Sequence, residues 1–274
     1  MARKPNVTRQ RIVSLAPSVT SILIEIGARR SLVAVSKWCA DVADVGNLPR
    51  LGDCWAIEPG AIESLKPTMV IGSVPFRTEA VAKILELPVP FVALNPRNLA
   101  DVYSDIELLG RLAGLPTGAR KLVARMQSEL DSIRRIGRAA VKRHANRPRV
   151  YSEAWPHPRI SSPPWVAELV EIAGGEFVGQ PGKRIDDEQV AAAEPQIIVL
   201  AWAATGDKSD PQQALESKAW QAVPAVRNKH VFAVRDELLN TPGPPLVEGA
   251  RTLLDLIHAS PGQSASKKVR AAHR

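Results

Sequence analysis

The residues best suited to recognising a ligand in this chain are its aromatic side chains, because tryptophan is unusually frequent among them. The 274 residues include six Trp, four Phe and two Tyr, whereas a core built only for packing would rely more on Phe. Trp38, Phe76, Trp155 and Trp202 each come soon after a short apolar segment of the strand type, and Trp55 lies in a loop between two such segments. Flat apolar faces of this kind suit a large planar or macrocyclic ligand.

Ordinary packing at the end of a sheet would explain any one of these rings equally well. The functional interpretation therefore depends on their number and on their presence in both halves of the chain. In open α/β sheets, ligands bind in the crevice outside the carboxyl ends of the strands. We therefore expect a groove between two lobes that is lined by rings from both. Trp220 lies within a helical pattern instead, and we expect it in the core.

Sequence motifs of enzymes are missing from the chain. No glycine-rich phosphate loop follows a strand, and no nucleophile elbow is present. The five histidines are scattered, so we expect neither a catalytic residue nor a metal site. His157 is the histidine nearest to the expected groove, and with Glu153 it forms the sole candidate pair for acid–base chemistry.

The excess positive charge of the chain lies at its two ends. The formal charge is +8, of which residues 1–11 carry +4 and residues 261–274 carry another +4, while the 28 basic and 28 acidic residues between them cancel. Because the body is neutral, we do not expect nucleic acid as a partner. Cys39 and Cys54 fit neither a disulfide framework nor a zinc pattern, which leaves free thiols or a single bridge between them.

Short apolar segments alternate with amphipathic ones along most of the chain, which is typical of βα units and a parallel sheet. The expected strands are 12–15, 32–35, 69–72, 90–94, 149–152, 197–200 and 231–234. The expected helices are 19–26, 59–65, 78–85, 99–113, 166–173, 188–193, 211–220 and 246–258. This order predicts an α/β fold.

One further helix is unusually long. Residues 117–144 contain no proline, and Leu122, Met126, Leu130 and Ile133 recur at three- and four-residue spacing, which predicts a single apolar stripe. About 26 residues of helix measure about 40 Å, enough to connect two lobes. The basic residues at the end of this helix are favourable partners for the negative end of the helix dipole.

The second half of the chain weakly repeats the first. Residues 62–71 and 190–199 align without gaps as a short helix, a proline turn and a buried strand. We therefore expect two related lobes, 11–115 and 147–260, joined by a connecting helix, 116–146. A flexible basic segment, 1–10, would precede them, and a disordered basic tail, 261–274, would follow. The first residues show no secretory signal, and no apolar stretch reaches membrane-spanning length.

Longer motifs resemble a known family over about residues 11–258. The first lobe carries RIVSLAPSVTSILIEIGA, LVAVSKWC and LPRLGD, followed by EPGAIESLKPTMVIG. The second carries WVAELVEIAGGEFVG, IDDEQVAAAEPQIIVLAW and AWQAVPAVRNKHVFAV. These runs resemble class III periplasmic binding proteins, the substrate-binding components of ABC importers for cobalamin, ferric siderophores and haem. The chain looks most like the cobalamin-binding branch.

The resemblance implies two Rossmann-like α/β lobes joined by one long helix, the helical-backbone type of metal receptor. By matching position it places Pro17 and Ser18 at the groove floor, and Trp55 near a tryptophan that contacts the corrin. Trp155 and Trp202 would contact the ligand from the second lobe, and Arg77 would contact an amide or carboxylate of the ligand. Members of the family also dock on a permease through an acidic residue on each lobe. Here Gly60 stands at the expected first position, so Glu58 and Glu216 are the nearest candidates.

The implied function is that of a monomeric, non-catalytic binding protein of the periplasm or cell surface, while the lack of a secretory signal in the first residues leaves the cytoplasm as an open alternative. It would take a cobalamin-like corrinoid as its ligand, with no cofactor of its own, and would deliver it to an ABC permease. Two alternatives remain open at this point. One is a ferric siderophore or haem on the same scaffold, and the other is a tetrapyrrole metal chelatase that uses His157 and Glu153.

Overall fold

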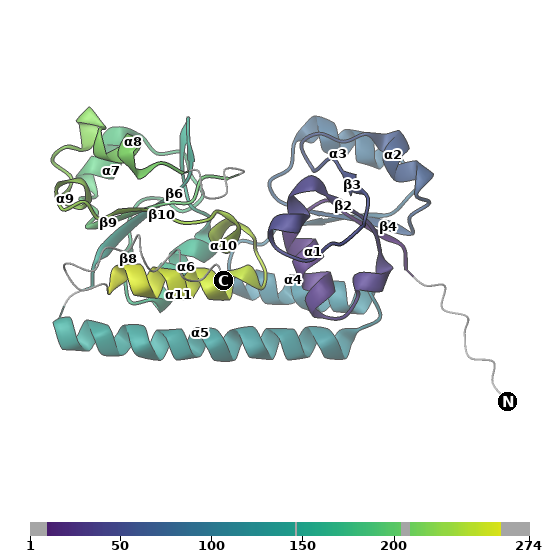
Figure 1. Ribbon diagram of the computed structural model, residues 1–274, viewed down its shortest axis with the longest axis horizontal. Coiled ribbons are helices and arrows are strands. Elements are labelled where there is room, and N and C mark those ends of the chain that lie inside the picture. Colours follow the sequence, from purple (N-terminus) through teal and green to yellow (C-terminus); the bar gives the residue numbers. More distant parts are fainter. Residues whose placement is uncertain (1–9, 146, 204–208, 259–274) are drawn as a thin grey trace. The chain divides into compact units, whose positions relative to one another are not determined.

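A computed structural model describes residues 10–145, 147–203 and 209–258 of the chain. Two compact units are present: the first comprises residues 1–96 and 100–124, and the second comprises residues 97–99 and 125–274. The boundary falls within the long helix α5 (Pro116–His144) rather than at its ends (Figure 1). The expected basic segment 1–10, except Gln10, and the expected tail 261–274 lie outside the described residues.

The first unit is a five-stranded parallel sheet in the order β3-β2-β1-β4-β5. Its strands are β1 (Ile12–Ser14), β2 (Leu32–Ser36), β3 (Arg50–Leu51), β4 (Met69–Ser73) and β5 (Phe91–Leu94). Its helices, besides the start of α5, are α1 (Pro17–Glu25), α2 (Pro59–Ser64), α3 (Thr78–Leu85) and α4 (Leu99–Leu112). Buried residues fill the two central strands β1 and β4, as expected for a parallel sheet covered on both faces. The predicted α/β fold is confirmed here.

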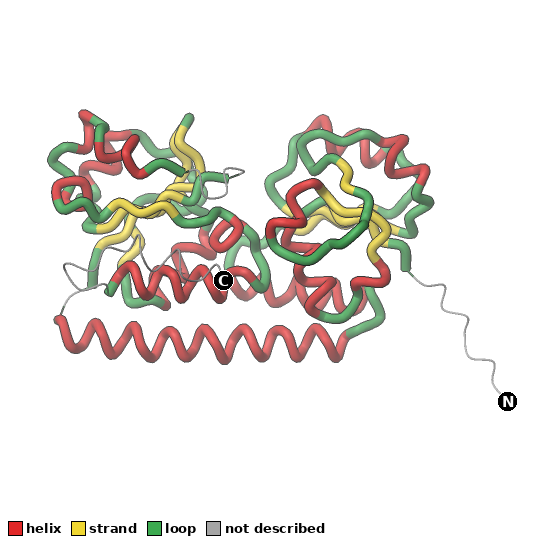
Figure 2. The backbone as a smooth tube through the Cα atoms, viewed as in Figure 1, coloured by secondary structure: helices red, strands yellow, loops and turns green. Residues whose placement is uncertain are grey.

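The second unit is built around the strand order β10-β9-β6-β7, with β8 paired to β6. Its strands are β6 (Arg149–Pro156), β7 (Arg159–Ser161), β8 (Glu176–Phe177), β9 (Ile197–Leu200) and β10 (Val231–Ala233). Its helices are α6 (Pro164–Ile172), α7 (Asp187–Ala192), α8 (Pro211–Leu215), α9 (Pro224–Arg227), α10 (Glu237–Asn240) and α11 (Pro245–Ile257). In each unit the strands lie between helices (Figure 2). No helix among the described residues is both long and apolar enough to cross a membrane.

Two expectations for the second unit were wrong in detail. The strand expected to end at residue 152 continues to Pro156 and turns back through the antiparallel strand β7, forming a hairpin. The helix expected over 211–220 ends at Leu215, and Trp220 lies in a separate 3₁₀ turn, Lys218–Trp220. Trp220 is nevertheless fully buried, as expected.

The two units share a common core topology. In the first unit β1 pairs with β4, and in the second β6 pairs with β9, always in parallel. The resemblance extends to single residues. Lys66 and Glu194, 128 positions apart, both have a left-handed backbone conformation, with φ of 45° and 42°. Each precedes the proline that separates a short helix from its buried strand. The weak sequence repeat therefore reflects one backbone plan used twice.

Helix α5 packs closely against each unit at a glycine. A Cβ atom at Gly118 would lie 2.6 Å from the carbonyl oxygen of Ile26, the residue that ends α1. A Cβ atom at Gly137 would lie 2.7 Å from the carbonyl carbon of Ala173, the residue that ends α6. The predicted apolar stripe of α5 is confirmed, since all four of its residues, Leu122, Met126, Leu130 and Ile133, are buried.

We predict that Gly137→Ala destabilises the protein, although alanine is normally the better helix former. The added methyl group must displace backbone atoms of Ala173, and such overpacking costs about 1–3 kcal/mol. Urea unfolding curves measure the change. Gly60→Ala in α2 is the matched control, because a Cβ there meets nothing within 4 Å. Equal stability of the two variants would contradict close packing of α5 at Gly137.

Candidate functional site

The first unit gathers its predicted site residues at the carboxyl ends of β1, β2 and β4. Pro17 and Ser18 begin α1 directly after β1, with Ser18 buried and Pro17 half-buried. Trp38 lies in the 3₁₀ turn Lys37–Asp41 that follows β2. Phe76 and Arg77 follow β4 and precede α3. The connections after three neighbouring strands therefore supply these residues, in agreement with the sequence prediction.

Asp53 links the two tryptophans of this unit. One carboxylate oxygen, Oδ2, accepts a hydrogen bond of 2.7 Å from the indole Nε1 of Trp38. The other, Oδ1, accepts hydrogen bonds from the backbone N–H groups of Trp55 and Ala56, at 2.9 and 3.1 Å. An Asx turn of this kind fixes the local backbone. Trp55 is therefore held on an ordered turn while 53% of its surface is exposed.

The same loop is anchored to the sheet through Cys54. Its carbonyl oxygen accepts a hydrogen bond of 3.2 Å from the backbone N–H of Arg77. Burial raises the pKa of the Cys54 thiol to about 12, so this side chain stays protonated and packs as an apolar group. Cys39 is also buried, and both thiols are free.

Phe76 and Arg77 differ in how far they face solvent. Phe76 is half-buried and packs edge-to-face on Phe91, with ring centroids 6.2 Å apart. Arg77 is exposed and lies 3.5 Å from Glu79. Among these residues, Trp55 and Arg77 thus offer the most accessible side chains.

In the second unit the hairpin formed by β6 and β7 carries Trp155. The ring is 40% exposed, and its indole Nε1 donates a hydrogen bond of 2.9 Å to the carbonyl oxygen of His157. His157 lies at the exposed tip of the hairpin. The indole orientation is therefore fixed by the turn, although much of the ring faces water.

A buried carboxylate, Glu153, lies at the base of this hairpin and is 0% exposed. It accepts hydrogen bonds from the hydroxyl of Tyr151 and the indole of Trp202, both at 2.9 Å. Arg159 on β7 donates to both of its oxygens through Nη1, at 3.2 and 2.9 Å. Every donor is supplied by the chain itself, which satisfies the requirement for a buried charge.

Arg159 in turn joins the hairpin to the helix and turn beneath it. Its Nε lies 2.5 Å from the carboxylate of Asp187, the first residue of α7. Its guanidinium carbon lies 4.1 Å from the ring centroid of Trp220. Burial and the negative charge of Glu153 raise the pKa of the Tyr151 hydroxyl, so it remains a donor to that carboxylate at neutral pH.

Trp202 follows β9, as the sequence predicted, but its ring is buried. Only 5% of its surface is exposed, and the ring belongs to the apolar core of the second unit. Its N–H group is used by Glu153. Because so little of the ring reaches solvent, we assign Trp202 to the support of the hairpin base rather than to a face for stacking.

The residues that the sequence interpretation missed are the polar ones that hold the rings. These residues are Asp53, Arg159 and Asp187, which lie two to thirty-two positions from the nearest exposed tryptophan. Only Asp53, two residues before Trp55, could have been suggested by the sequence next to the ring. Glu153 was noticed, but as a possible acid–base partner of His157. The structure places it in a buried network with Arg159, whereas His157 is exposed.

The two acidic residues that the resemblance suggested for docking, Glu58 and Glu216, both lie on the surface of their units. Glu58 is exposed and caps the start of α2 by position, without a side-chain hydrogen bond to the helix. Glu216 is exposed at the end of α8, where it accepts a hydrogen bond of 3.0 Å from Gln212. No group of three or more His, Cys, Asp or Glu side chains within the described ranges is arranged to hold a metal ion.

We predict that Arg159→Met destabilises the protein by about 3–5 kcal/mol, because it leaves the buried Glu153 carboxylate without its cation. The double variant with Glu153→Gln should recover a large part of that loss. Urea unfolding measures all variants. Arg149→Met is the matched control, since the Arg149–Glu194 pair is exposed and is worth about 1 kcal/mol or less. If both Arg→Met variants lost the same stability, the assigned role of Arg159 would be wrong.

Comparison with known proteins gives one consistent family. At the sequence level the chain is 25% identical over 259 residues to an ABC transporter substrate-binding lipoprotein of Bacillus subtilis, covering 91% of this chain and 80% of the relative. It is 24% identical over 243 residues to a vitamin B12-binding protein of Vibrio parahaemolyticus, covering 86% and 84%.

The fold agrees with solved structures of the same kind. A periplasmic heme-binding protein of Pseudomonas aeruginosa superposes with a TM-score of 0.80 at 20% identity, covering 92% of this chain and 94% of that one. The sequence model of the family described as periplasmic binding protein matches residues 12–238. The chain therefore belongs to the periplasmic binding protein family.

Proposed function

We propose that this protein is the substrate-binding component of an ABC importer and that its ligand is a cobalamin-like corrinoid. The observation that carries the proposal is the pair of exposed indole rings on hydrogen-bonded turns, Trp55 in one unit and Trp155 in the other. Relatives named vitamin B12-binding proteins support the choice of ligand. The corrinoid is the cargo of this protein and not a cofactor.

The physical basis is the match between the rings and a macrocycle. A corrin ring offers a broad, largely apolar face with amides at its periphery. Trp55 and Trp155 would contact such faces, with Trp38 and Phe76 beside Trp55 and the exposed Arg77 near a peripheral amide. Pro17 and Ser18, at the end of β1, would form the floor. Rings that are already oriented lose little freedom on binding, which favours affinity.

Binding without covalent chemistry is part of this proposal. Glu153, the one acidic residue close in sequence to His157, is committed to Arg159, Tyr151 and Trp202, so it has no lone pair left for proton transfer to a bound ligand. A chelatase mechanism based on His157 and Glu153 is therefore disfavoured. We infer an extracytoplasmic, monomeric protein, in keeping with the family and with the lipoprotein relative.

For docking on a permease we propose Glu58 in the first unit. In the second unit Glu216 is the residue that the family resemblance suggests. The repeat offers another residue for the second unit. Asp186 lies 128 positions after Glu58, is exposed, and caps α7 as Glu58 precedes α2. Asp186 is therefore the acidic residue of the second unit at the position equivalent to Glu58.

Co-migration with cyanocobalamin tests the proposal. The purified protein is mixed with cyanocobalamin at micromolar concentration and passed over a gel-filtration column while the visible spectrum is recorded. We expect red absorbance in the protein peak at about one ligand per chain, since nanomolar to micromolar affinity is ordinary for such sites. A protein peak without corrin absorbance, from a sample that is folded by circular dichroism, would contradict a corrinoid ligand.

Haem is the second candidate, because His157 is exposed on the same hairpin as Trp155 and its imidazole could ligate iron. Tyr151 is not available for that role, since it is buried and donates to Glu153. The same column run with haemin distinguishes the two ligands. Haemin that co-migrates and loses its spectral shift in His157→Ala, without corrin binding, would favour haem.

A further inference from the structure

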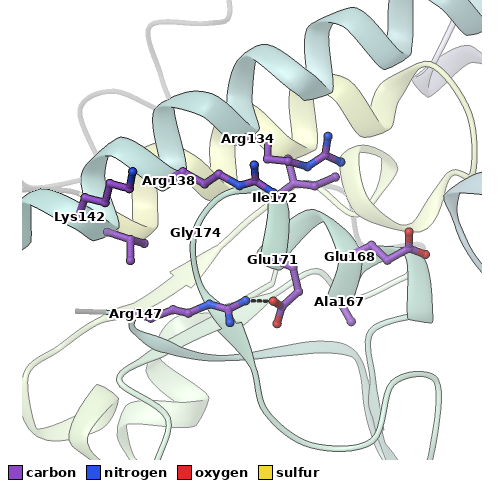
Figure 3. A pocket seen from close by; sticks show the side chains of 10 residues that line it. Arg134, Arg138, Lys142, Arg147, Ala167, Glu168, Glu171, Ile172 and Gly174 are labelled. Atoms are coloured by element: carbon purple, nitrogen blue, oxygen red, sulfur yellow. Dashed lines mark ion pairs between the residues drawn. The ribbon is translucent and has the colours of Figure 1, made fainter. Parts of the chain in front are cut away.

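A second pocket lies in the second unit between α5 and α6, away from the hairpin that carries Trp155. Its volume is about 750 Å³. Arg134, Arg138 and Lys142 line it from α5, and Glu168 and Glu171 line it from α6 (Figure 3). Arg147, which follows α5, closes one end. The proposed corrinoid site uses none of these residues.

Both acidic residues of this pocket already have partners. Glu171 forms an ion pair with Arg147 and also accepts a hydrogen bond of 3.3 Å from the backbone N–H of Phe177. Glu168 accepts a hydrogen bond of 3.0 Å from the backbone N–H of Leu99, the first residue of α4. Both carboxylates therefore have structural roles, and Glu171 is already paired with a cation.

Arg138 and Lys142 are the cations left over. Neither has a carboxylate within ion-pair distance among the described residues, whereas Arg134 pairs with Asp131. The two residues are four positions apart in the helix, so their Cα atoms lie about 6 Å apart along the axis of α5. The pocket-lining side chains include four cations and two carboxylates, an excess of two positive charges. The negative end of the α5 dipole offsets only about half a charge.

The rest of the lining is apolar. Val141 from α5, with Ala167 and Ile172 from α6, lies between the charged groups. Figure 3 shows Arg138 and Lys142 along α5, with Ala167 and Glu171 on the facing helix. An apolar patch beside two uncompensated cations suits a molecule that has an apolar body and an anionic group.

We propose that this pocket binds an organic anion with an apolar body. Arg138 and Lys142 would hold its carboxylate, sulfonate or phosphate group, and Val141, Ala167 and Ile172 would contact the apolar part. This pocket shares no residue with the proposed corrinoid site, so binding at one site does not require binding at the other.

Two fluorescent probes test this site, 8-anilinonaphthalene-1-sulfonate and its uncharged relative N-phenyl-1-naphthylamine. Arg138→Glu combined with Lys142→Glu should weaken sulfonate binding by about tenfold or more, since two charge-assisted contacts are lost. The same variant should leave binding of the uncharged probe within about twofold, because the apolar contacts remain. Ala167→Phe, which fills the pocket without changing charge, should weaken both probes.

Arg135→Glu combined with Arg143→Glu is the matched control. Both residues are exposed on α5 and neither lines the pocket, so the sulfonate affinity should stay within about twofold. An equal loss in this control would mean unspecific attraction and would overturn the proposal. Unchanged sulfonate binding in both pocket variants would overturn it as well.

Folding is checked by circular dichroism for every variant. If the charge reversals fail to fold, Arg138→Gln with Lys142→Gln applies the same test. Cyanocobalamin binding by each variant is measured in parallel. Corrinoid binding is expected to be unaffected by the pocket variants. Failure of the native protein to bind the sulfonate probe, with corrinoid binding intact, refutes the pocket, whereas failure to bind cyanocobalamin, with probe binding intact, refutes the proposed function.

Discussion

The proposed function follows from one physical interaction, the contact between an indole ring and water. Exposing a large apolar ring to solvent is unfavourable, and a folded chain normally buries such rings wherever it can. Trp202 and Trp220 follow that rule, whereas Trp55 and Trp155 leave 53% and 40% of their surfaces exposed. A ligand that covers such a ring recovers the hydrophobic stabilisation that the protein alone forgoes, and this is why we propose both rings as binding surfaces.

An exposed ring binds more favourably when the turn that carries it is ordered, and the two units order these turns differently. In the first, the single carboxylate of Asp53 orders the backbone at Trp55 and holds the indole of Trp38. In the second, the indole N–H of Trp155 is held by the carbonyl of His157, on a hairpin whose base is joined by Glu153 and Arg159. Burying an ion pair costs desolvation, and the aligned donors around Glu153 offset that cost. The core topology of the units is shared, but the devices that orient their rings are not.

The sequence was sufficient for the parts of the structure that depend on local pattern. The spacing of apolar residues predicted the apolar stripe of α5. Sequence pattern also predicted the short helix, proline turn and strand around Pro67 and Pro195. The hairpin was not, because Pro156 and Pro158 interrupt the alternation that marks a strand and its partner is antiparallel in an otherwise parallel pattern. Trp202 was placed at the correct strand end, yet no local pattern could reveal that Glu153, 49 residues away, takes up its N–H group. Contacts between distant residues decide which rings face solvent, so the exposed pair could be identified only from the structure.

Calorimetric titration of cyanocobalamin into the native protein, Trp55→Ala and Trp155→Ala tests whether the exposed indole rings bind the ligand. If Trp55 and Trp155 both contact the ligand, each substitution should weaken affinity by about tenfold or more, as for a central aromatic anchor, and the stoichiometry should stay at one ligand per chain. Native affinity in either variant, with the fold intact, would show that the substituted ring does not contact the ligand.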